Sequence, residues 1–187
     1  MTTDASMRRS PDAHSTPAAD ALSGLSAEEF KLAFRNHAAG VSVITAEGAV
    51  GPVGLTATSV FSVSANPPLL VFSISSISSS APTILAADTL VVHLLGEGQL
   101  DIAQLCATSG IDRFADTSRW SRLMTGEPFF PSAHAWVRGK VINRMEAGDS
   151  TVIAVHVVQA KVPTTPEAPL VYHNRTWHSL GPHSQLL

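Results

Sequence analysis

The sequence predicts a mainly β protein: a closed or nearly closed barrel of antiparallel strands with a few helices. Short apolar, β-branched runs recur along the chain, and Gly, Pro, Asn or Asp residues separate them. Helical spacing of apolar residues is confined to a few short segments. Hydrophobic residues make up 44% of the 187 residues and charged residues only 14%, so we expect one domain with a well-filled core.

Ordered structure is expected to begin at Ser26. Residues 1–25 are rich in Ser, Thr, Pro and Ala and lack hydrophobic periodicity, which is typical of a disordered leader. Ser26 and Glu29 have the spacing of a capping box, and apolar residues at helical spacing predict a helix that ends at Gly40. A strand over 41–46 and a turn at 47–48 are expected to follow.

Residues 51–80 form the most unusual stretch, because two β-like runs there are bordered by Ser and Thr and carry no charge. The first run predicts a strand over 53–64. Proline cannot donate to a central ladder, so Pro67 and Pro68 mark a corner before a buried strand over 69–74. We expect the two strands to be neighbours in the barrel, with a serine loop after the second.

The remaining chain alternates short strands with two helices and one irregular segment. Aromatic residues predict a packed loop over 111–131, and residues 146–149 are a turn signal. Residues 26–181 would form the domain and 182–187 a tail. The expected helices are 83–87 and 99–108, and the expected strands are 90–95, 133–144, 151–162 and 170–172.

Composition excludes several classes of protein. A net charge of −3 lacks the basic footprint of a nucleic-acid-binding protein. No apolar run is long enough to cross a bilayer. Cys106 is the single cysteine, so no internal disulfide can form, and a cytoplasmic location is expected.

Neither a metal site nor a nucleophile is indicated. The eight histidines have no zinc-binding spacing, and His134 and His156 fall within strand patterns where we expect satisfied sheet residues. Cys106 lies on the apolar side of a predicted helix, where a thiol usually packs. No Gly-x-Ser-x-Gly motif is present.

Nucleotide binding has more support, although neither a Rossmann nor a P-loop motif occurs. Ser75 to Ser80 lie between a strand and a short helix, where hydroxyls and backbone N–H groups can receive a phosphate. A solvated polar linker would have the same composition. Composition alone leaves both interpretations open.

The order of the motifs along the chain distinguishes the phosphate-binding interpretation from the solvated-linker interpretation. The chain resembles the small flavin reductase family of NAD(P)H:flavin oxidoreductases with an FMN-binding split barrel, especially the reductase components of two-component monooxygenases. The resemblance covers roughly residues 30–180. Its motifs, in order, are AGVSVIT (39–45), PVGLTATS (52–59), SVS (62–64), PPL (67–69), SSS (78–80), VVHLL (91–95), DRFA (112–115), AGD (147–149) and PLVYH (169–173).

The resemblance implies a Greek-key split barrel with peripheral helices and assigns a role to each matching position. It implies no catalytic side chain and no metal, because hydride passes between the two cofactors. The flavin ring and ribityl chain would lie along Pro52, Val53, Gly54, Leu55, Thr56, Ala57, Thr58, Ser59, Ser73, Ile74 and Ser75. Ser78, Ser79 and Ser80 would bind the phosphate, Arg113 and Phe114 would cover the site, and Asp149, Ser150, Tyr172 and His173 would lie near the nicotinamide.

Three positions depart from the family pattern: Ser150 replaces a frequent His, Ser79 a frequent basic residue, and His93 a frequent Asn. The expected activity is NADH- or NADPH-dependent reduction of FMN or FAD. A homodimer that supplies reduced flavin to a monooxygenase partner is expected. The alternatives are an FMN-binding protein with little reductase activity, favoured by Ser150, and an FMN-dependent split-barrel oxidase of another substrate.

Overall fold

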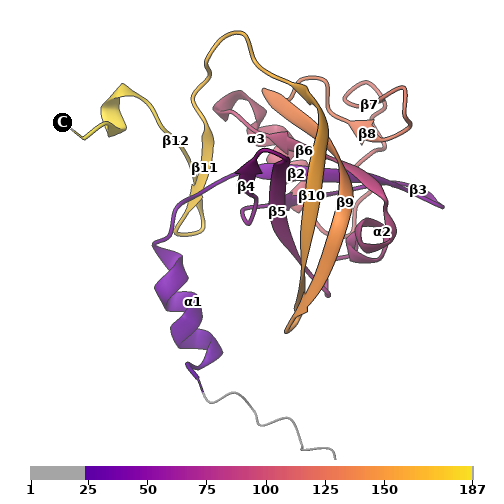
Figure 1. Ribbon diagram of the computed structural model, residues 1–187. Coiled ribbons are helices and arrows are strands. Elements are labelled where there is room, and N and C mark those ends of the chain that lie inside the picture. The colour runs from indigo at the N-terminus through magenta and orange to yellow at the C-terminus, as the bar shows by residue number, and fades with distance from the viewer. Residues whose placement is uncertain (1–23, 187) are drawn as a thin grey trace, which may run out of the picture.

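The computed structural model describes residues 24–186, and its main feature is a curled, antiparallel seven-stranded sheet (Figure 1). The strand order is β3-β2-β6-β9-β10-β5-β4, so β3 and β4 lie at the two edges. The prediction of a mainly β, antiparallel fold is confirmed. The strands are β2 (Ser42–Gly48), β3 (Gly51–Ala57), β4 (Phe61–Ala65), β5 (Pro68–Ser75), β6 (Thr89–Leu94), β9 (Ala135–Ala147) and β10 (Ser150–Lys161).

The sheet curls around one apolar core. In β5 the side chains of Leu70, Phe72 and Ile74 are buried in strict alternation, which is the period-2 pattern of a strand with one face inward. They share the core with Ile44 of β2, on the far side of the strand order. Each such side chain contributes about 1.5–3 kcal/mol through burial. The two halves of the sheet therefore face each other across a single interior.

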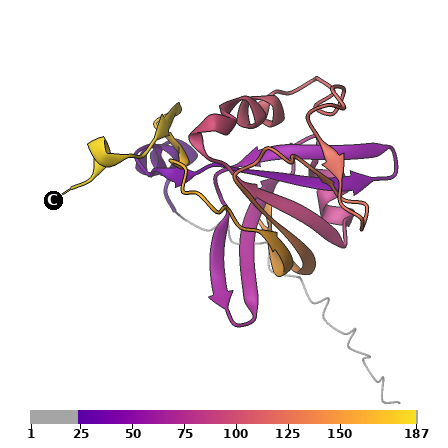
Figure 2. The same ribbon diagram turned by 90° about the horizontal axis from the view of Figure 1, so that it is seen from above.

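Two helices complete the barrel. Helix α2 (Ala81–Ala86) buries Ile84 in the central core. Helix α3 (Leu100–Ala107) follows the 3₁₀ turn η1 (Glu97–Gln99) and lies against β2 and β3, outside the curled sheet (Figure 2). Its buried side chains Ile102, Ala103 and Cys106 form a second apolar cluster.

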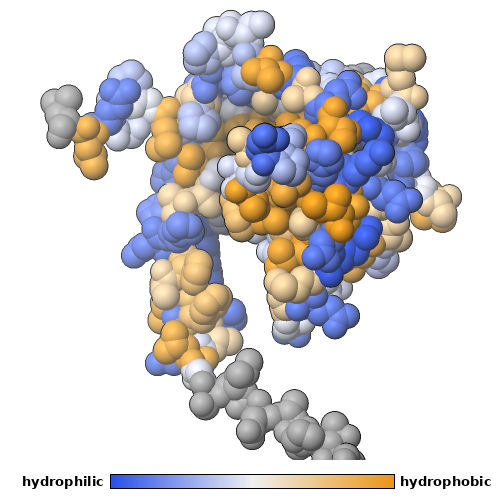
Figure 3. Space-filling model, in the orientation of Figure 1, coloured by the Kyte–Doolittle hydropathy of each residue, from blue (hydrophilic) through white to orange (hydrophobic). Residues whose placement is uncertain are grey.

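A small sheet and an exposed helix stand beside the barrel. The small sheet contains β1 (Ala39–Gly40), β11 (Leu170–His173) and β12 (Thr176–Ser179). The 3₁₀ turn η2 (Pro182–Ser184) lies close to the C-terminus. Helix α1 (Ala27–Arg35) has the predicted capping box but buries no residue, and it extends away from the barrel (Figures 1 and 3).

Several predicted boundaries are wrong at the start of the chain. Helix α1 ends at Arg35 rather than Gly40, because residues 39–40 pair with β11. The predicted turn at 47–48 belongs to β2, and residues 49–50 form the turn. The predicted strand over 53–64 is two strands, because the chain leaves β3 at Thr58 and turns into β4.

Other corrections concern how strands are paired. Strands β3 and β5 are not hydrogen-bonded neighbours, since β3 pairs with β2 whereas β5 lies between β10 and β4. Strand β11 belongs to the small sheet rather than to the barrel. The predicted loop over 111–131 is packed by aromatics as expected, but it also contains the short pair β7 (Ser121–Arg122) and β8 (Pro128–Phe129).

The predicted leader, residues 1–25, lies outside the described residues except for its last two. Within residues 24–186, no helix is long and apolar enough to cross a membrane.

Candidate functional site

Two grooves border the hydroxyl-rich stretch. The first, here the serine groove, has a volume of about 510 Å³ and lies between β3, the end of β5, the 75–79 loop and the C-terminal end of α3. The second, here the apolar groove, has a volume of about 780 Å³. Its walls come from the C-terminal end of α1 and the segment after it, the 58–61 connection and β5, and they include Phe34, Phe61 and Phe72.

Three of the predicted flavin-binding hydroxyls act as structural ties. Thr56 Oγ1 donates to Ala103 O of α3 at 2.6 Å, and Ser80 Oγ donates to Gly54 O of β3 at 3.0 Å. Ser59 Oγ donates to Ser73 O and accepts from Ser73 N, both at 3.1 Å. These bonds join β3 to α3 and to the residue before α2, and they join the 58–60 connection to β5.

Five other hydroxyls have no acceptor among the described residues: those of Thr58, Ser73, Ser75, Ser78 and Ser79. The last three line the serine groove, and Ser79 is exposed. In the loop, Ser76 N donates to Asp149 O and Ser78 N to Ser75 O, but the N–H groups of Ile77 and Ser79 have no acceptor within residues 24–186. The groove thus presents neutral hydroxyl and amide donors.

Arg113 is anchored at the edge of the serine groove. Its Nε and Nη2 donate to Thr108 O at 3.1 and 2.8 Å, just beyond the C-terminus of α3. Its Nη1 donates to Gly54 O at 3.0 Å and to Ser80 Oγ at 3.2 Å. The guanidinium therefore connects α3, β3 and the residue before α2.

Phe114 is buried, and it lines the smaller cavity beside Arg113 rather than the serine groove. Its ring is buried in the second apolar cluster, edge-on to Trp120 and stacked on Phe130. A Cβ placed on Gly54 would lie 3.3 Å from this ring and 3.4 Å from the Cys106 sulfur, so a larger residue at 54 would crowd the packing. Cys106 is buried in this cluster, which confirms the prediction that it packs, and burial raises the pKa of its thiol to about 12.

The other predicted flavin-contacting residues divide between grooves and core. Pro52 and Val53 line a smaller cavity of about 140 Å³ together with Ser79 and Arg113. Leu55 and Ile74 line the serine groove, although Ile74 is almost fully buried. Ala57 belongs to the central core.

The four predicted nicotinamide-side residues lie in two places. Ser150 begins β10 opposite Ser75, and Asp149 occupies the preceding turn after Gly148, whose φ is +62°. Tyr172 and His173 instead line a groove of about 340 Å³ with Thr58 and α1. Neither pair lines the serine groove.

Two buried polar arrangements, here together the buried polar cluster, were not predicted: His93 with its backbone partners, and the ion pair of Glu127 and Arg138. His93 Nδ1 donates to Val43 O at 2.9 Å and its Nε2 accepts from Phe130 N at 3.1 Å, and burial lowers its pKa to about 4. Burial would raise the pKa of Glu127, but hydrogen bonds from Arg138, Thr125 and Thr89 outweigh it and bring that pKa to about 2. No sequence motif marks these residues, because partners far apart in the chain create the cluster.

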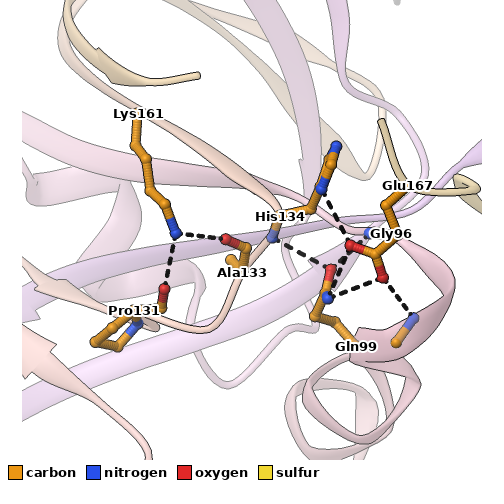
Figure 4. Close-up of polar contacts among 8 residues, drawn as sticks. Gly96, Gln99, Pro131, Ala133, His134, Lys161 and Glu167 are labelled. Atoms are coloured by element: carbon orange, nitrogen blue, oxygen red, sulfur yellow. Dashed lines mark hydrogen bonds and ion pairs between the residues drawn. The ribbon is translucent and has the colours of Figure 1, made fainter. Parts of the chain in front are cut away.

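A second polar network pins residues 162–169, here the strap, to the start of α3 (Figure 4). Glu167 accepts from Gly98 N at 2.9 Å and pairs with His134 Nδ1 at 3.0 Å. Gln99 accepts from Gly96 N at 2.7 Å and donates to Glu167. His134, predicted as a sheet residue, thus precedes β9 and pairs with a carboxylate. Among the described residues no group of three His, Cys, Asp or Glu side chains is placed to hold a metal ion.

Comparison with known proteins gives one consistent family. Residues 34–181 match the flavin reductase like domain. The chain is 41% identical, over 96% of both chains, to an NADH:FMN oxidoreductase of Rhodococcus qingshengii. A flavin reductase domain protein from Arthrobacter sp. FB24 superposes with a TM-score of 0.78 at 34% identity, over 83% of this chain and 96% of that one. The flavin reductase component of a bacterial two-component tryptophan halogenase superposes with a TM-score of 0.74 at 26% identity, over 83% and 98%.

Proposed function

This chain belongs to the flavin reductase family, and from that premise we propose that it transfers hydride from NADH to FMN at the serine groove. The observation that supports this placement is the neutral donor set of Ser75, Ser78 and Ser79 in a groove without acidic residues. The choice of NADH and FMN follows the Rhodococcus relative's name.

The residues present fit a flavin nucleotide. A volume of about 510 Å³ lies within the range of small-molecule sites, about 300–1,000 Å³. Apolar walls from Leu55 and Ile74 suit a flat ring, and unpaired hydroxyl and backbone N–H groups suit ribityl oxygens and a phosphate. The hydroxyls of Ser75, Ser78 and Ser79 have no acceptor among the described residues, so a ligand would not compete with an existing bond for their protons.

The chain's own contribution is to bind and orient. Bound flavin accepts the hydride that the reduced nicotinamide supplies, so the reacting atoms belong to the two nucleotides. Fixed neutral donors can stabilise the negative charge that develops during the transfer. Neither buried titratable group near this region takes part, because the Cys106 thiol stays protonated and both ring nitrogens of His93 are hydrogen-bonded to the backbone of Val43 and Phe130.

The activity is tested by mixing purified protein with NADH and FMN and following the nicotinamide absorbance. We expect oxidation well above a protein-free control that contains the same flavin. The proposal is wrong if the rate equals that control at every flavin concentration.

One observation favours a second candidate, an FMN-binding protein with weak reductase activity. Ser150 stands directly opposite Ser75, a residue of the serine groove, in the β5–β10 ladder, at a position where the family resemblance leads us to expect a histidine. Under this alternative the wild type binds FMN but oxidises NADH slowly, and Ser150→His raises the rate. A wild-type rate that Ser150→His does not increase would exclude it.

We propose further that the protein is a homodimer in which α1 packs on a second copy. Phe30, Leu32 and Phe34 are each more than half exposed on a nine-residue helix. A helix this short is marginal in water without tertiary packing. Phe34 also lines the apolar groove, which gives a second copy a continuous surface to cover.

Sedimentation velocity tests the dimer. We expect wild type to sediment as a dimer and Phe34→Glu as a monomer at the same concentration. Met124→Glu is the matched control, because Met124 is fully exposed at the β7–β8 tip, away from α1. A monomeric wild type, or dissociation by both variants, would contradict the assignment.

Reduced FMN is proposed to leave the groove for a separate flavin-dependent monooxygenase. Two-component systems are represented among the similar structures by the halogenase reductase component. If the product diffuses, a monooxygenase separated from this protein by a dialysis membrane still forms its product when FMN and NADH are supplied. Activity only in direct contact would indicate transfer within a complex instead.

A further inference from the structure

A further cavity, here the strap pocket, lies between the strap and the segment that leads into β9. Its volume is about 550 Å³, and it shares no lining residue with the serine groove or the apolar groove. We propose that the strap pocket binds a small organic monocarboxylate, whose carboxylate group pairs with the ammonium group of Lys161. This site is separate from the proposed flavin site and does not depend on the proposed function.

Lys161, the last residue of β10, is held in place before any ligand binds. Its Nζ donates to Pro131 O at 3.0 Å and to Ala133 O at 3.2 Å (Figure 4). An ammonium group has three N–H donors, and the third has no acceptor within residues 24–186. A lysine whose amine is already positioned loses less conformational entropy on binding than a free surface lysine does. The third N–H is therefore available to a ligand in the pocket.

The charge of Lys161 is not neutralised within the described chain. No ion pair among residues 24–186 includes Lys161. Glu167, the only acidic residue that lines the pocket there, is engaged by His134 Nδ1 at 3.0 Å and by Gly98 N at 2.9 Å. The hydrogen bond from Gly98 N is the main reason why the pKa of Glu167 lies below its ordinary value. Figure 4 shows Lys161 and Glu167 on opposite sides of Ala133, so the pocket keeps one cation without an anionic partner.

The other lining residues suit an organic acid. Hydroxyl groups that have no hydrogen-bond partner within residues 24–186 can donate to carboxylate oxygens, and they belong to Ser132, Thr164 and Thr165. Apolar side chains can contact a hydrocarbon body, and they belong to Val162, Pro163 and Pro166. Because Glu167 carries a negative charge at another wall of the pocket, it would repel a dianion more strongly than a monocarboxylate.

Benzoate and butyrate are the probes for this site, and benzamide and butyramide are their neutral counterparts. Isothermal titration calorimetry measures their dissociation constants with and without FMN. We expect both acids to bind about 10-fold more tightly than their amides, which is the lower end of the range for a charge-assisted hydrogen bond. The constants should be the same with and without FMN. Backbone amide NMR signals should shift at residues 132–134 and 161–167 rather than at 75–80.

Lys161→Gln is the first variant, and it should weaken both acids by about 10-fold while it leaves the amides within about twofold of wild type. Lys140→Gln is the matched control, because it makes the same charge change at an exposed lysine of β9 that lines none of the cavities described above. Thr165→Asp places a carboxylate in the pocket without removing a hydrogen bond of Lys161, and it should weaken the acids to a similar extent. Thermal melts check that each variant is folded.

Three results would overturn the proposal. The first is the absence of saturable binding of either acid to wild type. The second is equal weakening by Lys161→Gln and Lys140→Gln, which would indicate a general effect of surface charge. The third is a set of NMR shifts confined to residues 75–80 and 113, which would place the acids in the serine groove. None of these measurements involves NADH oxidation, so failure of the strap pocket and failure of the proposed function are distinguishable.

Discussion

The buried polar cluster and the serine groove are both built from polar side chains next to the same sheet, but they differ in whether those side chains have partners. In the cluster, both ring nitrogens of His93 are hydrogen-bonded, and Glu127 accepts from Arg138 Nε at 2.7 Å. In the groove, Ser75 and Ser79 have no acceptor among the described residues. Polar groups that have protein partners therefore stabilise this fold, whereas those without partners are available to a ligand.

The division also runs through a single loop. Ser80 is buried and tied to Gly54, whereas Ser79, one residue earlier, is exposed on the groove. Residue type does not separate the two, because both are serines. Mutations that remove partners in the cluster should therefore change stability, and mutations in the groove should change binding.

The largest expected effect comes from Glu127→Ala. Glu127 is 2% exposed, and its removal leaves the Arg138 charge without its partner in a buried position. Breaking a buried ion pair in this way costs about 3–5 kcal/mol of unfolding free energy. Urea unfolding measures it, and Glu47→Ala is the matched control, because the Glu47–Arg122 pair is exposed and worth about 0–1 kcal/mol. Equal losses of unfolding free energy in Glu127→Ala and Glu47→Ala would show that the buried ion pair stabilises the protein no more than the exposed one.

The second effect is a pH dependence caused by His93. Its pKa falls from 6.5 to about 4 on folding. Between these two pH values the His93 side chain is therefore protonated in the unfolded chain but neutral in the folded protein. Stability is therefore full above pH 6.5 and falls as the pH drops towards 4, by up to about 3 kcal/mol.

Urea midpoints between pH 7 and 4.5 test this before carboxylates contribute strongly. We expect His93→Asn to be less stable than wild type but to lose less stability across that interval. A slope in the variant equal to that of wild type would assign the pH dependence to other groups.

The smallest expected effect is the difference between Ala substitutions of two adjacent serines, Ser79 and Ser80. Ser80→Ala leaves Gly54 O without one of its donors and should lower the unfolding free energy by about 1–3 kcal/mol. Ser79→Ala should change stability by less than about 0.5 kcal/mol and weaken FMN more than riboflavin. Thermal melts and fluorescence titrations of both variants decide the matter, and a Ser80→Ala protein as stable as Ser79→Ala would show that the tie is weak.

The fold class and most strands could be predicted because periodicity and turn residues are local signals. The sequence predicts a buried strand at Leu70, Phe72 and Ile74, and these side chains alternate with less buried ones in β5. The break between β3 and β4 was missed. The chain turns there at Ser59, which is hydrogen-bonded to Ser73 of β5, a residue distant in sequence. For the same reason the sequence could gather the site's hydroxyls into one stretch but could not tell Thr56, Ser59 and Ser80, which have acceptors, from Ser75 and Ser79. Partners distant in sequence decide that distinction.

The hydrogen bonds between Glu167 and the residues before α3 fix the end of the strap, so the position of the small sheet does not depend on the length of the strap before Glu167. Glu97 N donates to Ala168 O at 2.8 Å and Gly98 N to Glu167, so the last part of the strap is fixed where β11 begins. Residues 164–166 are exposed and carry no such bonds within the described chain. Loop-closure entropy rises only slowly with length. Insertions between Thr164 and Pro166 would therefore lengthen a surface loop and leave Tyr172 and His173 in register, so this segment is where the domain can accept added sequence.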